Sequence, residues 1–95
     1  MNKYEAMFIV RADLSEDDRK GLFNQINDAI QKNSGQLSAS SVWAERRKFY
    51  FVIKKQREGL YYLVNFSANP LTLKDMQHAF GLNENILRVL ISNVG

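Results

Sequence analysis

Residues 43–66, WAERRKFYFVIKKQREGLYYLVNF, are the most informative part of the sequence because their pattern predicts two strands joined by a short polar turn. Its first strand continues a run from Gln36 to Ile53 that contains neither Gly nor Pro. Because strands usually have five or six residues, a strand of this length either bulges midway or projects beyond its sheet. We expect the loop KKQREG, residues 54–59, to place Gly59 in the left-handed region before the strand 60–68 returns.

The chain before this hairpin predicts one strand and one helix. Segment 3–10, KYEAMFIV, is almost continuously apolar, which is typical of a strand buried on both faces. Ser15 is a good N-cap for the helix that follows, with Asp18 placed as in a capping box. Gly35 is placed to end this helix in the left-handed conformation.

The chain after the hairpin predicts a second helix and a last strand. Asn69 and Pro70 suit a helix cap and first helical position, Gly81 ends the helix, and residues 86–94 are rich in branched side chains. The order strand, helix, strand, strand, helix, strand indicates an α+β fold, the ferredoxin-like split βαβ sandwich, as a single domain over residues 1–95. We expect a four-stranded antiparallel sheet in the order 4-1-3-2, with both helices on one face and the second strand at an edge.

The positive charge of the chain is concentrated in the same hairpin. The net charge is +3, but residues 43–58 hold six basic and two acidic side chains, a local balance of +4. This distribution is typical of a surface that binds a polyanion. A solvated face, or an edge strand protected from aggregation by its charges, is the alternative interpretation.

Composition argues against catalysis, metal binding and membrane insertion. The chain has no cysteine and one histidine, His78, and its acidic run Glu16, Asp17, Asp18 suits a helix N-terminus better than an oxygen cage for a metal. No apolar run approaches the roughly 20 residues of a membrane span, and the N-terminus does not resemble a signal peptide. We therefore expect no enzyme, metal, cofactor, small-molecule substrate or membrane partner.

Two modes of nucleic-acid binding suit this fold. Base stacking on the third strand has Tyr61, Tyr62 and Phe66 available, but the strand lacks the glycine and the cation of the usual motif, so these rings are interpreted as packing residues. Phosphate contacts by the basic hairpin are the favoured mode.

Four segments resemble the bacterial small-subunit ribosomal protein S6 family, in order and with its spacing. They are YEAMFIV followed by DLSEDDR, the segment KNSGQL, the hairpin block WAERRKFYFVIKKQREGLYYLVNF, and LNENILRVLI. The resemblance covers essentially the whole chain. It implies a ferredoxin-like fold, no enzymatic activity, and a structural role in a bacterial or organellar ribosome, bound to the central domain of small-subunit (16S-type) rRNA together with ribosomal protein S18.

The resemblance also implies two sets of site residues. RNA contacts are expected from Lys3, Arg46, Arg47, Lys48, Lys54, Lys55, Arg57 and Arg88, and contacts with the protein partner from Trp43, Phe49, Tyr50 and Phe51. Relative to the family, the chain has one extra residue between Trp43 and Arg47. Because a shift of one residue turns side chains to the other face of a sheet unless a bulge absorbs it, the faces on which Trp43 and Arg46 lie are not predicted. A protein-binding adaptor or an ACT-like ligand-sensing dimer of the same fold is the alternative function.

Overall fold

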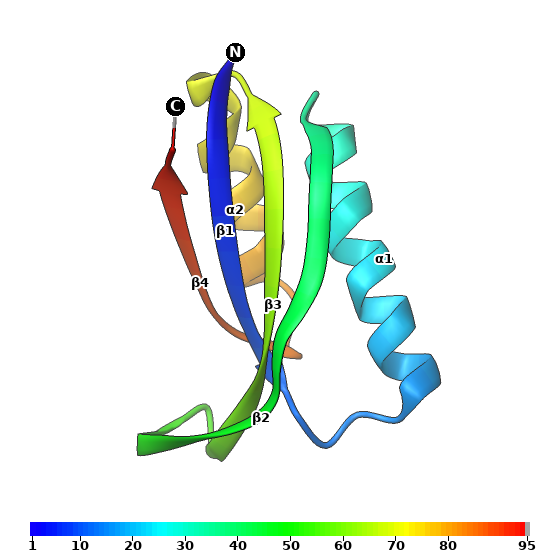
Figure 1. Ribbon diagram of the computed structural model, residues 1–95, viewed down its shortest axis with the longest axis vertical. Helices are drawn as coiled ribbons and strands as arrows, with labels where there is room; N and C mark the ends of the chain where they lie inside the picture. Colours follow the sequence, from blue (N-terminus) through cyan, green and yellow to red (C-terminus); the bar gives the residue numbers. More distant parts are fainter. Residues whose placement is uncertain (95) are drawn as a thin grey trace.

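The computed structural model describes residues 1–94 and has the predicted architecture (Figure 1). The elements are β1 (Asn2–Arg11), α1 (Glu16–Lys32), β2 (Gln36–Ile53), β3 (Gln56–Ala68), a 3-10 turn η1 (Pro70–Thr72), α2 (Leu73–Gly81) and β4 (Ile86–Asn93). The antiparallel sheet has the order β2-β3-β1-β4, and α1 and α2 cover one face. The ferredoxin-like prediction, with β2 at an edge, is confirmed.

The core lies between the helices and alternate residues of the central strands. Phe8, at 0% exposed, packs edge-on against Phe80 with 4.7 Å between ring centroids. Tyr62 stacks on Phe23 of α1 at 3.9 Å. Because Tyr62 and Phe66 are both buried in this core, the interpretation of these two rings as packing residues is confirmed, whereas Tyr61 points to the opposite face.

The face of the sheet without helices is called the open face. On this face β1 is not buried along its whole length: Lys3 is exposed, and Glu5 and Met7 are half-buried. The prediction of a strand buried on both sides therefore holds only at Phe8–Val10, where Ile9 is 5% exposed. The reason is that the far end of the β2–β3 hairpin bends over Ile9.

Helix α1 begins as predicted but ends differently. Ser15 Oγ accepts a hydrogen bond from the Asp18 backbone N–H at 3.1 Å. At the other end, Ser34 takes the left-handed conformation, with φ 64°, and Gly35 does not, so the prediction for Gly35 was wrong. The Ser34 N–H donates to Gln31 O and the Gly35 N–H to Ile30 O, the Schellman pattern with Ser34 at the left-handed position. Gly35 is required for another reason, since a Cβ there would lie 2.5 Å from Ile30 Cγ2.

The second helical segment also differs from the prediction in one detail. Asn69 caps the 3-10 turn that starts at Pro70, with Asn69 Oδ1 accepting from the Leu71 N–H at 3.0 Å. The α-helix itself begins only at Leu73 and ends at Gly81. Met76 and Phe80 of α2 are buried against the sheet, as their spacing predicts.

The long strand β2 both bulges and projects. Its pairing with β3 shifts register at four places, and two of these shifts lie between Val42 and Arg47. Bulges thus lie at the place where the resemblance led us to expect an extra residue. Beyond them, residues 46–58, called the arm, leave the sheet and curl past the end that is opposite the two chain termini (Figure 1).

The arm reverses direction at two lysines. Lys54 and Lys55 have φ of 47° and 67°, which is typical of a two-residue hairpin turn. The predicted loop with Gly59 in the left-handed region was therefore wrong, because β3 already begins at Gln56 and Gly59 lies within it. Gly59 lets Phe49 approach the backbone, since a Cβ there would lie 2.7 Å from Phe49 Cζ.

Candidate nucleic-acid interface

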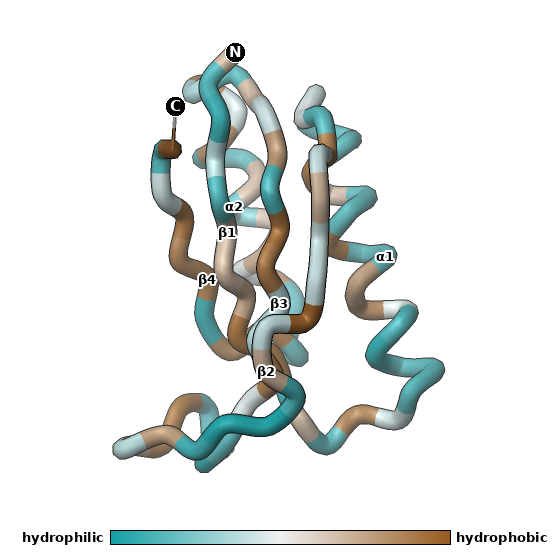
Figure 2. Tube along the Cα trace, in the orientation of Figure 1, coloured by the Kyte–Doolittle hydropathy of each residue, from teal (hydrophilic) through white to brown (hydrophobic). Residues whose placement is uncertain are grey.

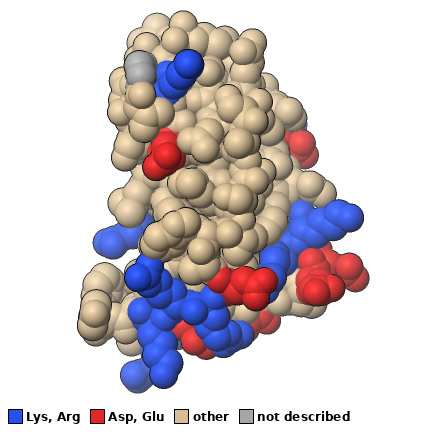
Figure 3. Space-filling model, viewed as in Figure 1, with Lys and Arg blue, Asp and Glu red and all other residues tan. Residues whose placement is uncertain are grey.

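Basic side chains gather at the arm end of the molecule. Figure 3 shows blue groups clustered there, while most of the open face above them is uncharged. Lys3 is the exception among the predicted RNA contacts. It pairs with Ser67 near the chain termini, whereas the arm starts where Arg11 pairs with Gly59, at the other end of the sheet. The structure therefore does not bring Lys3 together with the arm.

Two predicted cations of the arm are held by the protein itself. Arg46 forms an ion pair with Glu58, and its Nη2 donates to the carbonyl of Ala12 at 3.3 Å. Lys54 Nζ donates to the carbonyl of Ile86 at 3.0 Å, which ties the turn of the arm to the start of β4. Both side chains fix the position of the arm.

Two other cations lie over aromatic rings. The Arg47 guanidinium carbon is 5.0 Å from the centroid of Trp43 and 5.8 Å from that of Tyr61. Arg88 of β4 lies 5.9 Å from the centroid of Phe51 in the same way. Ring contacts of this kind orient a guanidinium without neutralising it, so both groups keep their charge for a ligand.

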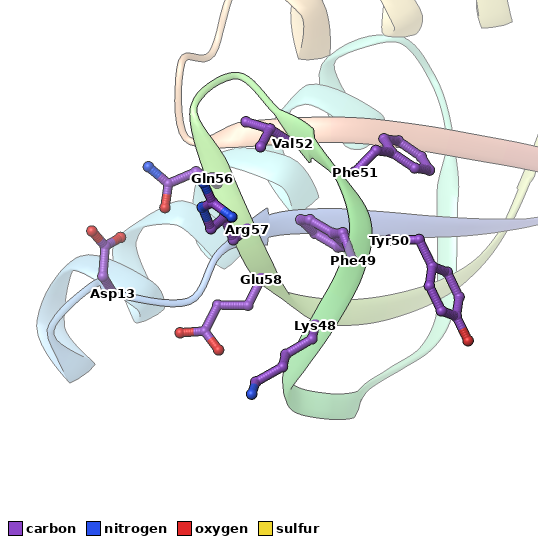
Figure 4. A pocket seen from close by; sticks show the side chains of 9 residues that line it. All are labelled: Asp13, Lys48, Phe49, Tyr50, Phe51, Val52, Gln56, Arg57 and Glu58. Atoms are coloured by element: carbon purple, nitrogen blue, oxygen red, sulfur yellow. The ribbon is translucent and has the colours of Figure 1, made fainter.

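Three arm cations face solvent. Lys48, Lys55 and Arg57 are exposed, and within residues 1–94 their side chains have no ion pair, hydrogen bond or ring contact. Lys48 pairs with Glu58 across the hairpin, so these two side chains share one face (Figure 4). Arg47 pairs with Gly59 and therefore points to the other face.

Apolar side chains at the end of the arm are unusually exposed. Residues 49–52 have no register partner in β3, because Lys48 pairs with Glu58 and the next pair is Ile53 with Gln56. This bulge presents Tyr50, which is fully exposed, and Phe51 and Val52, which are more than half exposed. Figure 2 shows the hydrophilic arginine run followed by this hydrophobic stretch.

The bulge borders an open groove of about 720 Å³ between the arm and the loop after β1. Its lining includes the basic residues Lys48 and Arg57 and the acidic residues Asp13 and Glu58, and Tyr50 projects outward from it (Figure 4). An apolar centre with a rim of mixed charge is typical of a protein interface.

Asp13, at the edge of this groove, is held by Arg11. Arg11 Nε and Nη2 donate to the two carboxylate oxygens at 3.0 and 2.8 Å. These hydrogen bonds lower the pKa of Asp13 below its ordinary value and raise the pKa of Arg11. Asp13 and Arg11 therefore form a charge-paired unit at the edge of the groove.

The four residues predicted to meet the protein partner do not form one surface. Trp43 lies on the open face against Tyr61, with 5.7 Å between ring centroids, whereas Tyr50 sits on the bulge of the arm. Phe49 is half-buried between Tyr61 and Gly59 and belongs to the packing of the arm. Sequence reasoning missed Tyr61 as a partner of Trp43, although its alternation with Tyr62 places it on the open face.

Two other kinds of site are absent from the described part of the chain. Among residues 1–94, no group of three or more His, Cys, Asp or Glu side chains is arranged to hold a metal ion. None of the described helices has the length and apolar character needed to cross a membrane.

Comparison with known proteins gives one consistent family. The family model for ribosomal protein S6 matches residues 3–93. The small ribosomal subunit protein bS6 of Thermoanaerobacter pseudethanolicus is 34% identical over 91 residues, covering 96% of this chain and 95% of the relative. The corresponding protein of Symbiobacterium thermophilum has the same identity and the same coverage.

Solved structures agree on the fold. The crystal structure of 30S ribosomal protein S6 from Thermotoga maritima matches with a TM-score of 0.87 and 24% identity, over 98% of this chain and 87% of that one. The C-terminal domain of MgtC from Mycobacterium tuberculosis matches with a TM-score of 0.64 at 10% identity, over 99% and 88% of the two chains, and shows the fold alone. With a family model that spans nearly all of its residues and relatives above 30% identity, the chain belongs to the ribosomal protein S6 family.

Proposed function

We propose that this protein is a structural constituent of the small ribosomal subunit, that it has no enzymatic activity, and that it binds 16S-type rRNA together with ribosomal protein S18. Membership of the ribosomal protein S6 family supports the ribosomal role. The observation that carries the RNA contact is the set of three exposed arm cations, Lys48, Lys55 and Arg57, which have no partner within residues 1–94. Arg47 and Arg88 extend the same basic end, whereas Arg46 and Lys54 position the arm.

The protein partner is assigned to the bulge of the arm. Tyr50 and its neighbours Phe51 and Val52 are exposed in a chain whose other large apolar side chains mostly pack inside. Aromatic side chains that become buried at the centre of an interface are typical binding anchors. We therefore place ribosomal protein S18 against Tyr50 and the groove beside it, with RNA on the cations around them.

The salt dependence of RNA binding tests the cations. Replacing Lys48, Lys55 and Arg57 together with Gln is expected to reduce the slope of log affinity against log salt by about 2 to 3, because each lost phosphate contact removes about 0.7–0.9. The measurement is a filter-binding titration of a central-domain rRNA fragment at several salt concentrations, with ribosomal protein S18 present. The matched control is the same charge change at Lys20, Lys32 and Lys74, which are exposed on the helices. An unchanged slope in the arm variant would exclude phosphate contacts by the arm.

A single substitution tests the protein partner. Tyr50→Ala is expected to weaken binding of ribosomal protein S18 by about thirtyfold or more, the loss that corresponds to a buried aromatic anchor of about 2 kcal/mol. The measurement is isothermal titration calorimetry with the two proteins. The control is Leu71→Ala, an equally apolar and exposed residue far from the arm, at 84% exposed. Equal affinities for the wild type and Tyr50→Ala would show that the partner binds elsewhere.

The alternative function as an ACT-like sensor or adaptor dimer makes a different prediction. Such modules pair side by side and do not need a basic arm. If the protein copurifies with ribosomal particles, the ribosomal function is supported. If it is isolated as a free homodimer, the sensor or adaptor function is supported.

A further inference from the structure

The open face beside the arm carries a small cluster of aromatic and basic side chains, and the contacts proposed above give no role to its two aromatic rings. The cluster consists of Trp43, Arg47 and Tyr61. Trp43 contacts Tyr61 on the neighbouring strand, and the Arg47 guanidinium lies over both rings. Phe49 supports Tyr61 from the arm side, with 6.5 Å between ring centroids. All three members are held in place by neighbours before any ligand arrives.

The indole of Trp43 is not part of the core. Trp43 is 54% exposed, while the ring of Tyr62, on the other face of the same hairpin, is 4% exposed. Trp43 also lies on the open face and not on the bulge that carries Tyr50. The exposed indole is thus a separate surface from the one assigned to the protein partner.

The acidic side chains of the hairpin are paired with other cations. Glu45 pairs with Arg19 of α1, with 3.8 Å between Nη1 and Oε1, and Glu58 pairs with Arg46. Arg47 therefore has no ion pair of its own within residues 1–94, and basic groups cluster at this end of the molecule with acidic groups beside them (Figure 3). An exposed indole beside a planar cation without an ion pair complements an aromatic group that carries negative charge, which is the chemistry of a nucleotide.

The cluster also supplies what the third strand lacks. A base-stacking sheet surface combines aromatic rings with a cation, and β3 provides only Tyr61. The neighbouring strand β2 adds Trp43, whose ring contacts that of Tyr61, and Arg47, which pairs with Gly59. Further along the open face, Asn65 provides an amide that can hydrogen-bond to a base edge.

We propose that Trp43 and Arg47 form a stacking site for one unpaired base of a single-stranded RNA segment, with Tyr61 as its support. The inference rests on the proposed RNA-binding function and deepens it, because it distinguishes the open face, which takes a base, from the arm, which takes phosphates. The base stacks on the exposed side of the indole, and the Arg47 guanidinium borders it and neutralises the adjoining phosphate.

Trp43 is the single tryptophan of the chain, so its fluorescence reports on this site alone. Titration of the full chain at low salt with a single-stranded oligoribonucleotide is expected to quench that fluorescence. An RNA duplex or inorganic polyphosphate is expected to bind through the arm without quenching it. Fluorescence anisotropy of end-labelled RNA measures binding independently of Trp43.

Variants separate stacking from charge. Trp43→Ala is expected to weaken single-strand binding about tenfold, within the range for one stacked base, and to leave duplex binding unchanged. Trp43→Phe retains a ring and should recover most of the affinity, which excludes a folding defect as the cause. Arg47→Lys keeps the charge but removes the planar group, so affinity should fall while the salt slope stays the same. Leu71→Ala, at an exposed apolar residue far from the arm, is the control that leaves single-strand binding unchanged.

The outcomes are distinct from those of the proposed function. RNA binding without quenching, together with unchanged affinity in Trp43→Ala, would overturn the stacking site while leaving the RNA-binding function intact. Loss of affinity for ribosomal protein S18 in Trp43→Ala, with RNA affinity unchanged, would show a protein occupant and would also overturn it. Absence of RNA binding by the wild type even with ribosomal protein S18 present would overturn the proposed function itself.

Discussion

Replacing Phe8 with Ala is expected to lower the free energy of unfolding by about 3–5 kcal/mol, the usual cost of removing a buried phenylalanine ring. Phe8 is completely buried and contacts Phe80 of α2 and Tyr62 of β3, whose ring centroids lie 4.7 and 6.4 Å away. A domain of this size has about 5–14 kcal/mol of total stability, so the variant loses a large share of it. Urea denaturation followed by circular dichroism measures the change, with an unaltered slope on denaturant.

The exposed ring of Tyr50 is the matched control for Phe8. Tyr50→Ala is expected to change the free energy of unfolding by no more than about 0.5 kcal/mol, because the side chain is fully exposed. The pair therefore separates a ring that holds the sheet and helices together from a ring that is available for binding. A loss of several kcal/mol in Tyr50→Ala would place Tyr50 in the core and contradict its assignment as a binding anchor.

Replacing Gly35 with Ala is expected to lower the free energy of unfolding by about 1–3 kcal/mol, the usual cost of overpacking. A Cβ at this position would lie 2.5 Å from Ile30 Cγ2 and 2.8 Å from the Ile30 carbonyl oxygen. The second contact is with backbone, so a side-chain rotation does not relieve it. The same urea titration measures the loss.

Two controls distinguish crowding from conformational preference. Gly21→Ala lies within α1, where a Cβ meets nothing within 4 Å, and is expected to raise the free energy of unfolding by about 1 kcal/mol. Ser34→Gly should be tolerated, because Ser34 is the residue with positive φ at this helix end. If Gly35→Ala were neutral, the close packing of Ile30 against the chain at Gly35 would be contradicted.

Local patterns in the sequence were sufficient for the elements and their order. Ser15 as a helix cap, the buried stripe of Met76 and Phe80, and the unbroken run Gln36–Ile53 each report on a few neighbouring residues. The crossover rule then leaves few arrangements for two helices and four strands, which is why the sheet order was predictable. The resemblance in the hairpin block was also specific enough to indicate the family.

The left-handed positions were predicted at the wrong residues. Glycine is the usual choice for positive φ, yet Ser34, Lys54 and Lys55 adopt it here. Gly35 and Gly59 instead leave room for Ile30 and Phe49, and Ile30 reaches its glycine across a turn while Phe49 reaches across the hairpin. The residues next to each glycine in the sequence do not show which side chain will pack against it, so the need for glycine at these positions could not be predicted from the local pattern.

The amino-acid sequence was enough to predict a ferredoxin-like sandwich with its excess positive charge on one hairpin. The role of each cation became clear only in the folded chain: Arg46 and Lys54 hold the arm, Arg47 lies over Trp43, and three others face solvent. This is so because a side chain's role depends on the groups that it contacts. Here those groups, the Ile86 carbonyl and the ring of Tyr61 among them, come from other strands that the fold brings alongside.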